Sequence, residues 1–83
     1  MSNTGKNILA VNNEPKVLEV VTALLEDNGF QVFSAENGLK ALEIFNTRRI
    51  SLVILDLLLP DIPGEDICRA IRSQSNIPLI MLR

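Results

Sequence analysis

The stretch "SLVILDLLLP", residues 51–60, holds the feature on which the fold prediction depends. Residues 52–55 are apolar without alternation, which is typical of a strand covered on both faces of a parallel sheet. Asp56 closes this run and three leucines follow it, so a carboxylate is held beside an apolar core. An unpaired buried carboxylate would cost several kcal/mol, so Asp56 needs a partner or access to solvent. The stretch predicts a buried strand that ends in a polar site.

Three more apolar runs predict strands, and a helical pattern lies in each interval between consecutive strands. The expected strands are residues 8–11, 30–35, 52–55 and 77–82. Each helical interval has apolar residues at helical spacing: Val17, Leu18, Val21, Leu24 and Leu25 in the first, Ala41, Leu42 and Phe45 in the second, and Ile67, Ala70 and Ile71 in the third.

Short polar segments separate these elements and supply helix start and stop signals. Pro15 suits the first turn of a helix, Gly29 suits a left-handed stop, and Asn37 suits a helix cap. The order β-α-β-α-β-α-β with short connections predicts a parallel α/β sheet with right-handed crossovers and helices on both faces.

The composition excludes several function classes. The 83 residues make one domain at most, with 47% hydrophobic residues and a net charge of −2. No basic run indicates a grip on nucleic acid or anionic lipid, and no histidine offers a general base. The single cysteine, Cys68, fits a reducing compartment, and no segment reaches the roughly 20 apolar residues of a membrane span. We therefore expect a soluble cytoplasmic domain.

Candidate site residues follow three of the expected strands, where open parallel sheets bind ligands. They are the Asn12-Asn13 pair, Asp56 and Arg83. Two readings of Asp56 are open: it accepts hydrogen bonds from loop amides, or it is a nucleophile or cation ligand. The asparagine pair is either turn chemistry, with Asn13 as a helix cap, or a site whose charge has been removed.

Several segments resemble the receiver domain of two-component response regulators. "ILAVNNEP" is similar to the first strand and acidic pocket of that family, and "LVILDLLLPDIPGEDICRAIR" to its acceptor strand, loop and third helix. The spacing from Asp56 through Pro60 to Gly64 is the specific part, and the resemblance runs from residue 6 to residue 82. It implies a flavodoxin-like (CheY-like) doubly wound sheet with strand order 2-1-3-4. Residues 1–83 are then expected to be a single receiver domain, truncated after the fourth strand.

The resemblance also implies a function and its residues. Asp56 would accept a phosphoryl group from a sensor histidine kinase, as a signalling module and not as an enzyme. Magnesium would be held by Asn12, Asn13, Asp56 and the backbone carbonyl of Leu58. Magnesium prefers such hard oxygen ligands.

The pocket departs from the family pattern in ways that predict weak function. The family has aspartates at Asn12 and Asn13. Each missing charge removes an attraction on the order of 4 kcal/mol before desolvation, at 4 Å and an effective dielectric near 20. We therefore expect magnesium to bind weakly or not at all. Arg83 stands where the family has a serine or threonine; it either pairs with phosphate or is only a terminal charge. Lys6 lies at the wrong end of its strand to replace the lysine of the family's fifth strand.

Two expectations follow from these departures. The first is an impaired receiver; the alternative is a pseudo-receiver that acts by interaction and oligomerisation without phosphorylation. The absence of the family's later elements leaves the fourth strand as an edge with apolar side chains. Such an edge invites pairing with another chain, so self-association through this strand is expected.

Overall fold

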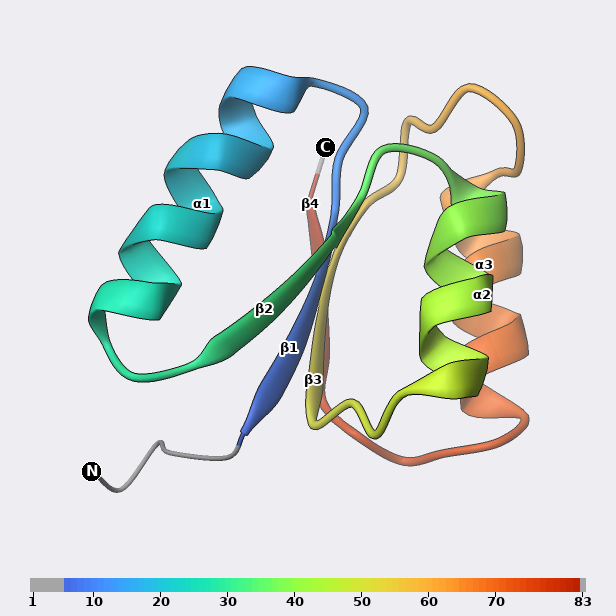
Figure 1. Ribbon diagram of the computed structural model, residues 1–83. Coiled ribbons are helices and arrows are strands. Elements are labelled where there is room, and N and C mark those ends of the chain that lie inside the picture. Colours follow the sequence, from blue (N-terminus) through green and yellow to red (C-terminus); the bar gives the residue numbers. More distant parts are fainter. Residues whose placement is uncertain (1–5, 83) are drawn as a thin grey trace.

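The computed structural model describes residues 6–82 and shows one four-stranded parallel sheet flanked by three helices (Figure 1). The sheet order is β2-β1-β3-β4, which confirms the predicted order 2-1-3-4. The elements follow the predicted alternation: β1 (Asn7–Val11), α1 (Pro15–Asp27), β2 (Gln31–Ala35), α2 (Gly38–Thr47), β3 (Leu52–Asp56), α3 (Gly64–Arg72) and β4 (Leu79–Leu82).

The helices lie on both faces of the sheet, with α1 on one face and α2 and α3 on the other (Figure 1). The face under α2 and α3 holds the main core, because alternate strand residues and both helices direct apolar side chains into it. Its members are Leu9, Val11, Ala35, Ala41, Ile50, Val53, Leu55, Ile67 and Ile71. On the opposite face, Ile8, Ala10 and Leu18 are buried. In strand β3, Val53 and Leu55 are buried on the α2–α3 side, whereas Leu52 and Ile54 are only half-buried on the α1 side. The prediction of a strand covered on both faces is therefore only partly met.

Four strand boundaries differ from the expectation by one or two residues. Strand β1 begins one residue earlier, at Asn7, and β3 ends one residue later, at Asp56. Hydrogen bonding explains the later starts of the other two strands. Strand β4 begins at Leu79 and not at residue 77, because Pro78 has no N–H to donate to the ladder. Strand β2 begins at Gln31 and not at residue 30, because the amide of Phe30 donates to the carbonyl of Leu25 at 3.2 Å. That bond, with the one from Gly29 to Glu26, forms a Schellman-type end to α1. Gly29 has a φ of 91°, as its role as a stop requires.

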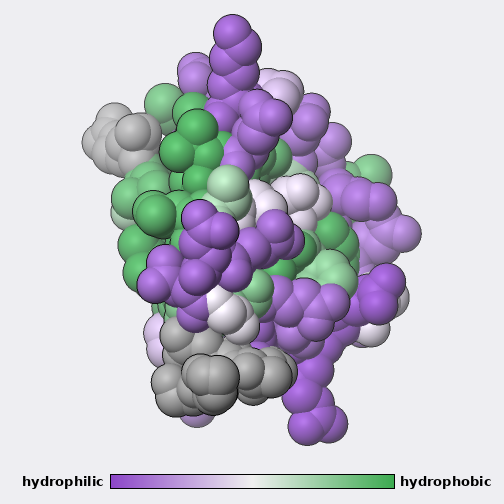
Figure 2. Space-filling view, turned by 60° about the vertical axis from the view of Figure 1, so that its left-hand side comes forward, coloured by the Kyte–Doolittle hydropathy of each residue, from purple (hydrophilic) through white to green (hydrophobic). Residues whose placement is uncertain are grey.

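The predicted apolar stripe of α1 is only partly buried. Leu18 is buried, whereas Val17 and Leu24 are exposed, and Val20 beside them is 66% exposed. Strand β4 is exposed as well, through Ile80, Met81 and Leu82. Ile80 and Leu82 alternate with Met81, and Leu82 lies on the α1 face beside Val17, so α1 and β4 share an incompletely covered apolar surface. Figure 2 shows hydrophobic residues gathered on one side of the molecule.

Candidate functional site

The strand register brings the predicted site residues together at the carboxyl edge of the sheet. Val11 pairs with Leu55 in adjacent parallel strands, so the next residues, Asn12 and Asp56, are neighbours. A hollow of about 520 Å³ lies there. Its walls are Asn12, Asn13, Glu14, Val17, Asp56, Leu58 and Leu82. The structure therefore assembles a polar site from segments more than forty residues apart in the chain.

Asp56 combines the two readings that its sequence position left open. Its Oδ1 accepts a hydrogen bond from the amide of Leu58 at 3.0 Å, which is a loop-capping role. The side chain is only half-buried and lines the hollow, so the carboxylate keeps access to solvent. No buried side-chain nitrogen or oxygen in residues 6–82 lacks a hydrogen-bond partner. Asp56 is thus both anchored and accessible.

The asparagine pair divides its roles differently from the expectation. Asn12 Oδ1 accepts a hydrogen bond from the amide of Glu14 at 2.8 Å, which makes the turn between β1 and α1. The predicted cap role of Asn13 is wrong: the N-cap residue of α1 is Glu14, and no side chain caps that helix. The backbone explains this, because the turn closed by Asn12 places Asn13 before the cap position. Asn13 is exposed on the wall of the hollow.

Glu14 and Leu82 are wall residues that the sequence reasoning did not assign to the site. Glu14 directly follows the asparagine pair and contributes a carboxylate to the hollow. Leu82 reaches the hollow because it pairs with Asp56 across the β3–β4 ladder. Glu14 directly follows a predicted site residue in the chain, and Leu82 lies opposite one in the sheet. These positions could have identified both residues.

Asp61 has a role that the sequence did not indicate. In the sequence, Asp61, Glu65 and Asp66 form a small acidic cluster, a pattern that predicts complements of the dipole at a helix amino terminus. Glu65 and Asp66 do lie in the first turn of α3, but the Asp61 carboxylate accepts hydrogen bonds from Gly38 and Leu39 at the start of α2, at 2.8 and 2.9 Å. These backbone N–H groups, with Gly38 first, lower the pKa of Asp61 below its ordinary value.

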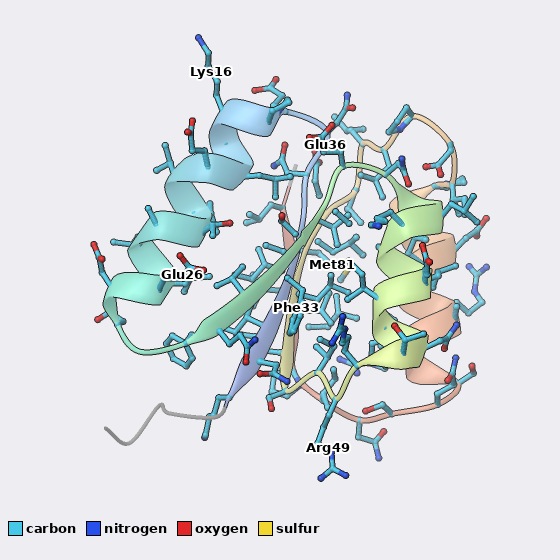
Figure 3. All side chains as sticks on the ribbon, viewed as in Figure 1. Lys16, Glu26, Phe33, Glu36, Arg49 and Met81 are labelled. Atoms are coloured by element: carbon cyan, nitrogen blue, oxygen red, sulfur yellow. The ribbon has the colours of Figure 1, made fainter. Side chains whose placement is uncertain are left out.

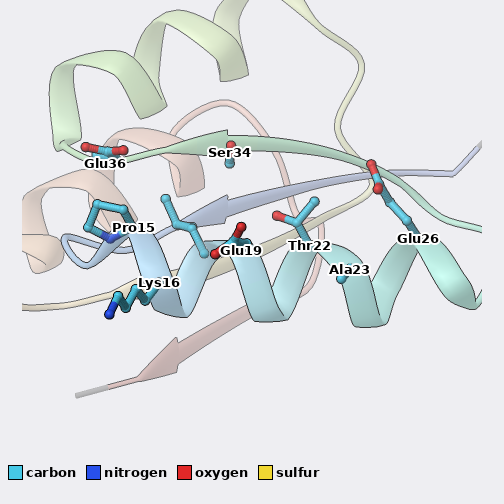
Figure 4. A pocket seen from close by; sticks show the side chains of 9 residues that line it. Pro15, Lys16, Glu19, Thr22, Ala23, Glu26, Ser34 and Glu36 are labelled. Atoms are coloured by element: carbon cyan, nitrogen blue, oxygen red, sulfur yellow. The ribbon is translucent and has the colours of Figure 1, made fainter.

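A second hollow lies between α1 and β2, away from Asp56 (Figure 4). Its walls carry three carboxylates, Glu19, Glu26 and Glu36, against a single cation, Lys16. Figure 3 shows Lys16 and Arg49 pointing into solvent at opposite ends of the molecule. Three like charges disfavour a phosphoryl group, so this hollow is a poor candidate for the site.

Two residues that the sequence singled out are not among the described walls of the hollow at Asp56. Arg83 lies outside the described residues. Lys6 precedes β1 at the amino end of the sheet, opposite the edge that holds Asp56, as predicted. Within residues 6–82, no three side chains of His, Cys, Asp or Glu gather into a group suited to a metal ion. None of the helices described is long and apolar enough to cross a membrane.

The fold and the site define a class: a parallel α/β domain with one accessible aspartate at the carboxyl end of a central strand. The response regulator receiver domain family matches residues 8–83, and the chain belongs to this family. The resemblance seen in the sequence is thereby confirmed.

Curated relatives share this domain as part of longer proteins. The chain is 37% identical over 82 residues to a "probable transcriptional regulator ycf27" of Porphyra purpurea, covering 99% of the chain and 34% of the relative. It is also 37% identical over 82 residues to "DNA-binding response regulator MtrA" of Mycolicibacterium smegmatis, covering 99% of the chain and 36% of the relative. The chain therefore spans about a third of the length of these relatives.

Solved structures show the same fold. Chemotaxis response regulator CheY4 of Vibrio cholerae superposes with a TM-score of 0.90 at 30% identity, over 94% of this chain and 68% of that one. Response regulator TrrA of Thermotoga maritima, in complex with Mg(2+)-BeF, has a TM-score of 0.83 at 35% identity, over 92% of this chain and 69% of that one. These similarities confirm the CheY-like fold.

Proposed function

We propose that this receiver domain accepts a phosphoryl group on Asp56 from a sensor histidine kinase, and does so with reduced efficiency. The observation that supports this is the accessible Asp56 carboxylate at the end of β3, on the wall of a hollow that it shares with Asn12, Asn13 and Glu14. A structure of TrrA in complex with histidine kinase ThkA supports the class of partner. The domain itself would make no nucleic-acid contact, in keeping with its net charge of −2.

The proposed transfer is a displacement at phosphorus. A carboxylate oxygen of Asp56 forms a bond to the phosphorus of a phosphohistidine, while the phosphorus–nitrogen bond breaks and its electron pair stays with the imidazole. The released imidazole takes a proton from solvent. The hydrogen bond from Leu58 to Oδ1 orients the carboxylate and leaves Oδ2 available for attack.

The donor set around Asp56 fits magnesium in type but is poor in charge. Asp56, the amide oxygens of Asn12 and Asn13 and the carbonyl of Leu58 are all hard oxygen ligands. Magnesium, when bound, would neutralise charge that develops on the transferred group. Asn12 Oδ1 already accepts a hydrogen bond from Glu14, and both asparagines are neutral, so we propose a weak site. Glu14 adds a carboxylate to the same hollow.

Phosphorylation is tested with a small-molecule phosphodonor and magnesium, followed by mass spectrometry of the intact protein. We expect slow, partial gain of one phosphoryl group that Asp56→Asn abolishes. The double variant Asn12→Asp/Asn13→Asp should raise magnesium affinity by orders of magnitude and speed the gain. An unchanged magnesium affinity in the double variant would contradict the proposed ligand set.

The second candidate function is a pseudo-receiver that signals by binding alone. The specific observation for it is that Asn12, a proposed magnesium ligand, is already used in the β1–α1 turn. Under this alternative the wild-type chain gains no phosphoryl group from either phosphodonor or kinase. The same experiment therefore separates the two candidates.

We also propose that the 83-residue chain associates with a second copy through β4 and the neighbouring side of α1. Strand β4 is an edge of the described sheet, and its Ile80 and Leu82 are exposed. Val17 of α1, which lines the same hollow as Leu82, adds exposed apolar surface. Exposed apolar edges of this kind promote pairing between chains.

Self-association is tested by sedimentation at increasing protein concentration. We expect Ile80→Lys to shift the chain toward monomer, because it places a charge in the exposed strand. Leu39→Lys is the matched control, since Leu39 is 70% exposed but lies on α2, away from this surface. A compact monomer at high concentration for the wild-type chain would contradict the proposal.

A further inference from the structure

The loop after Asp56 connects β3 to α3 and holds Leu58, so its position decides the shape of the site. Its first residues are attached near Asp56: Leu57 donates to the carbonyl of Leu82 at 2.9 Å, and Leu58 donates to Asp56 Oδ1 at 3.0 Å. At its far end, Gly64 donates to the carbonyl of Leu57 at 3.2 Å. The residues between these points need a separate anchor.

Asp61 supplies that anchor. Its Oδ1 accepts from Gly38 at 2.8 Å and its Oδ2 accepts from Leu39 at 2.9 Å, which ties the loop to the first turn of α2. Among the described residues, this is the only hydrogen-bonded connection from residues 59–62 to another helix or strand. Both carboxylate oxygens are used, so the link fixes the orientation of the side chain as well as its position.

The attachment supports the amino terminus of α2. Four backbone N–H groups at the start of a helix have no partner within it. Here the side chain of Asn37 serves one of them, the amide of Lys40 at 2.8 Å. Asp61 serves two more, the amides of Gly38 and Leu39, from 23 and 22 positions along the chain. Because a local cap already exists, Asp61 adds a connection between two elements and does not merely begin a helix.

Close packing at Gly38 makes this connection rigid. A Cβ on Gly38 would lie 2.9 Å from Ile62 Cβ and 2.9 Å from Ile67 Cδ1. Loop and helix therefore touch at the same place where the hydrogen bonds form. The loop cannot shift along α2 without breaking both the apolar contact and the hydrogen bonds.

We propose that Asp61 is a positioning residue that ties the loop after Asp56 to α2 and thereby holds Leu58 against the Asp56 carboxylate. The inference concerns the geometry of the site. Its consequence for phosphoryl transfer rests on the proposed function. The geometric part can be measured without phosphorylation.

Amide hydrogen exchange measured by NMR on the full 83-residue chain tests the geometric part. In Asp61→Ala we expect about tenfold faster exchange at Gly38 and Leu39, the loss of a hydrogen bond of typical strength. We expect faster exchange also at Leu58 and Gly64, whose amides donate to Asp56 and Leu57 and not to Asp61, and unchanged exchange at Val53 in the sheet. Asp66→Asn is the matched control, because Asp66 is an exposed acid paired only with Arg69 and removes the same charge.

A purely local cap would give a different pattern. If exchange rises at Gly38 and Leu39 but stays unchanged at Leu58 and Gly64, the positioning role is overturned. Asp61→Asn covers the case in which the alanine variant does not fold, since it keeps one accepting oxygen. It should also raise the exchange rates of the Leu58 and Gly64 amides, by a smaller factor. If the Leu58 and Gly64 amides exchange at the same rates in Asp61→Asn as in Asp66→Asn, the inference is also overturned.

The rate of phosphoryl gain then separates this inference from the proposed function. With a small-molecule phosphodonor and magnesium, we expect Asp61→Ala to slow the gain several-fold, Asp61→Asn to recover part of the rate, and Asp66→Asn to match wild type. If the wild-type chain gains no phosphoryl group while exchange at Leu58 still depends on Asp61, the proposed function fails and the positioning role stands. If the gain is unaffected by Asp61→Ala and exchange at Leu58 is unchanged, the positioning role fails alone.

Discussion

The two faces of the sheet have similar strand sequences, but the helices cover them to very different extents. In the central strand β3, Val53 and Leu55 are fully buried under α2 and α3, whereas Leu52 and Ile54 are half-buried on the α1 side. The edge strand β4 is open on both faces, with Ile80 47% and Met81 50% exposed. A helix is about 10 Å wide and strands lie about 4.8 Å apart, so one helix covers roughly two strands. Four strands need two helices, and within residues 6–82 the second face has only α1. The number of helices that pack on each face therefore determines how much of its apolar surface is buried.

Truncating one isoleucine on each face tests this difference with the largest expected effect. Ile67→Ala should lower the free energy of unfolding by about 2–5 kcal/mol, because it opens a cavity in the closed core. Ile80→Ala should lower it by about 1 kcal/mol or less, since much of that side chain already contacts water. Urea unfolding at low protein concentration measures both without a contribution from association. Equal losses in the two variants would show that the α1 face is as well packed as the other.

A glycine on the closed face gives the next largest effect. Gly64 begins α3, and a Cβ there would lie 2.5 Å from Leu57 Cα, so Gly64→Ala forces the helix away from the loop. We expect a loss of about 1–3 kcal/mol, the range for overpacked positions. Glu65→Ala is the control, because it is the next residue, is exposed, and leaves this contact unchanged. Equal stability of Gly64→Ala and wild type in urea unfolding would contradict the tight packing of α3 on Leu57.

The difference between the faces was visible in the sequence only in part. Element order could be predicted, because apolar runs and the signals at Pro15, Gly29 and Asn37 depend on local chemistry. The meeting of Asn12 with Asp56 was also predictable, since parallel strands bring their carboxyl ends to one edge. The exposure of Leu24 could not be predicted. Helical spacing identifies an apolar stripe, but it does not show how much of that stripe another element covers.

Long-range hydrogen bonds explain what the sequence did not reveal about the site. Asp61 was assigned to a dipole role by its place in an acidic group, yet its carboxylate reaches the start of α2, 23 positions away. A pattern within one segment carries no information about such a partner. The interpretation of Asn13 as a helix cap failed for a different, local reason: Asn12 accepts the amide of Glu14 two residues along the chain, and the cap position falls at Glu14.

Helix capping extends the comparison between the faces. On the closed side, Asn37 accepts a hydrogen bond from Lys40, so Asn37→Ala should cost about 1 kcal/mol. On the other side, Glu14 occupies the same position in α1 without a side-chain cap, so Glu14→Ala should change stability by about 0.5 kcal/mol or less. Thermal unfolding of the two variants under one buffer condition measures the difference. A loss for Glu14→Ala as large as that for Asn37→Ala would show that the two helix starts are equivalent.

The smallest effect concerns acid stability and the link between α2 and the loop. The backbone N–H groups of Gly38 and Leu39 lower the pKa of Asp61 in the folded chain. The stabilisation is therefore fully present above the unfolded pKa of about 3.9 and is lost as pH falls through the lower folded value. Asp61→Asn does not titrate, so its urea midpoint should fall less than that of wild type between pH 5 and pH 3.

Asp66→Asn separates this effect from general acid sensitivity. Asp66 carries the same charge, but its hydrogen-bond partner is the exposed Arg69 and not the start of α2. Its midpoint should fall with pH nearly as steeply as that of wild type. Parallel curves for wild type and Asp61→Asn would mean that the ionised Asp61 carboxylate does not stabilise the closed face. In that case the contact between the loop and α2 would depend on the apolar packing of Gly38 against Ile62 and Ile67 alone.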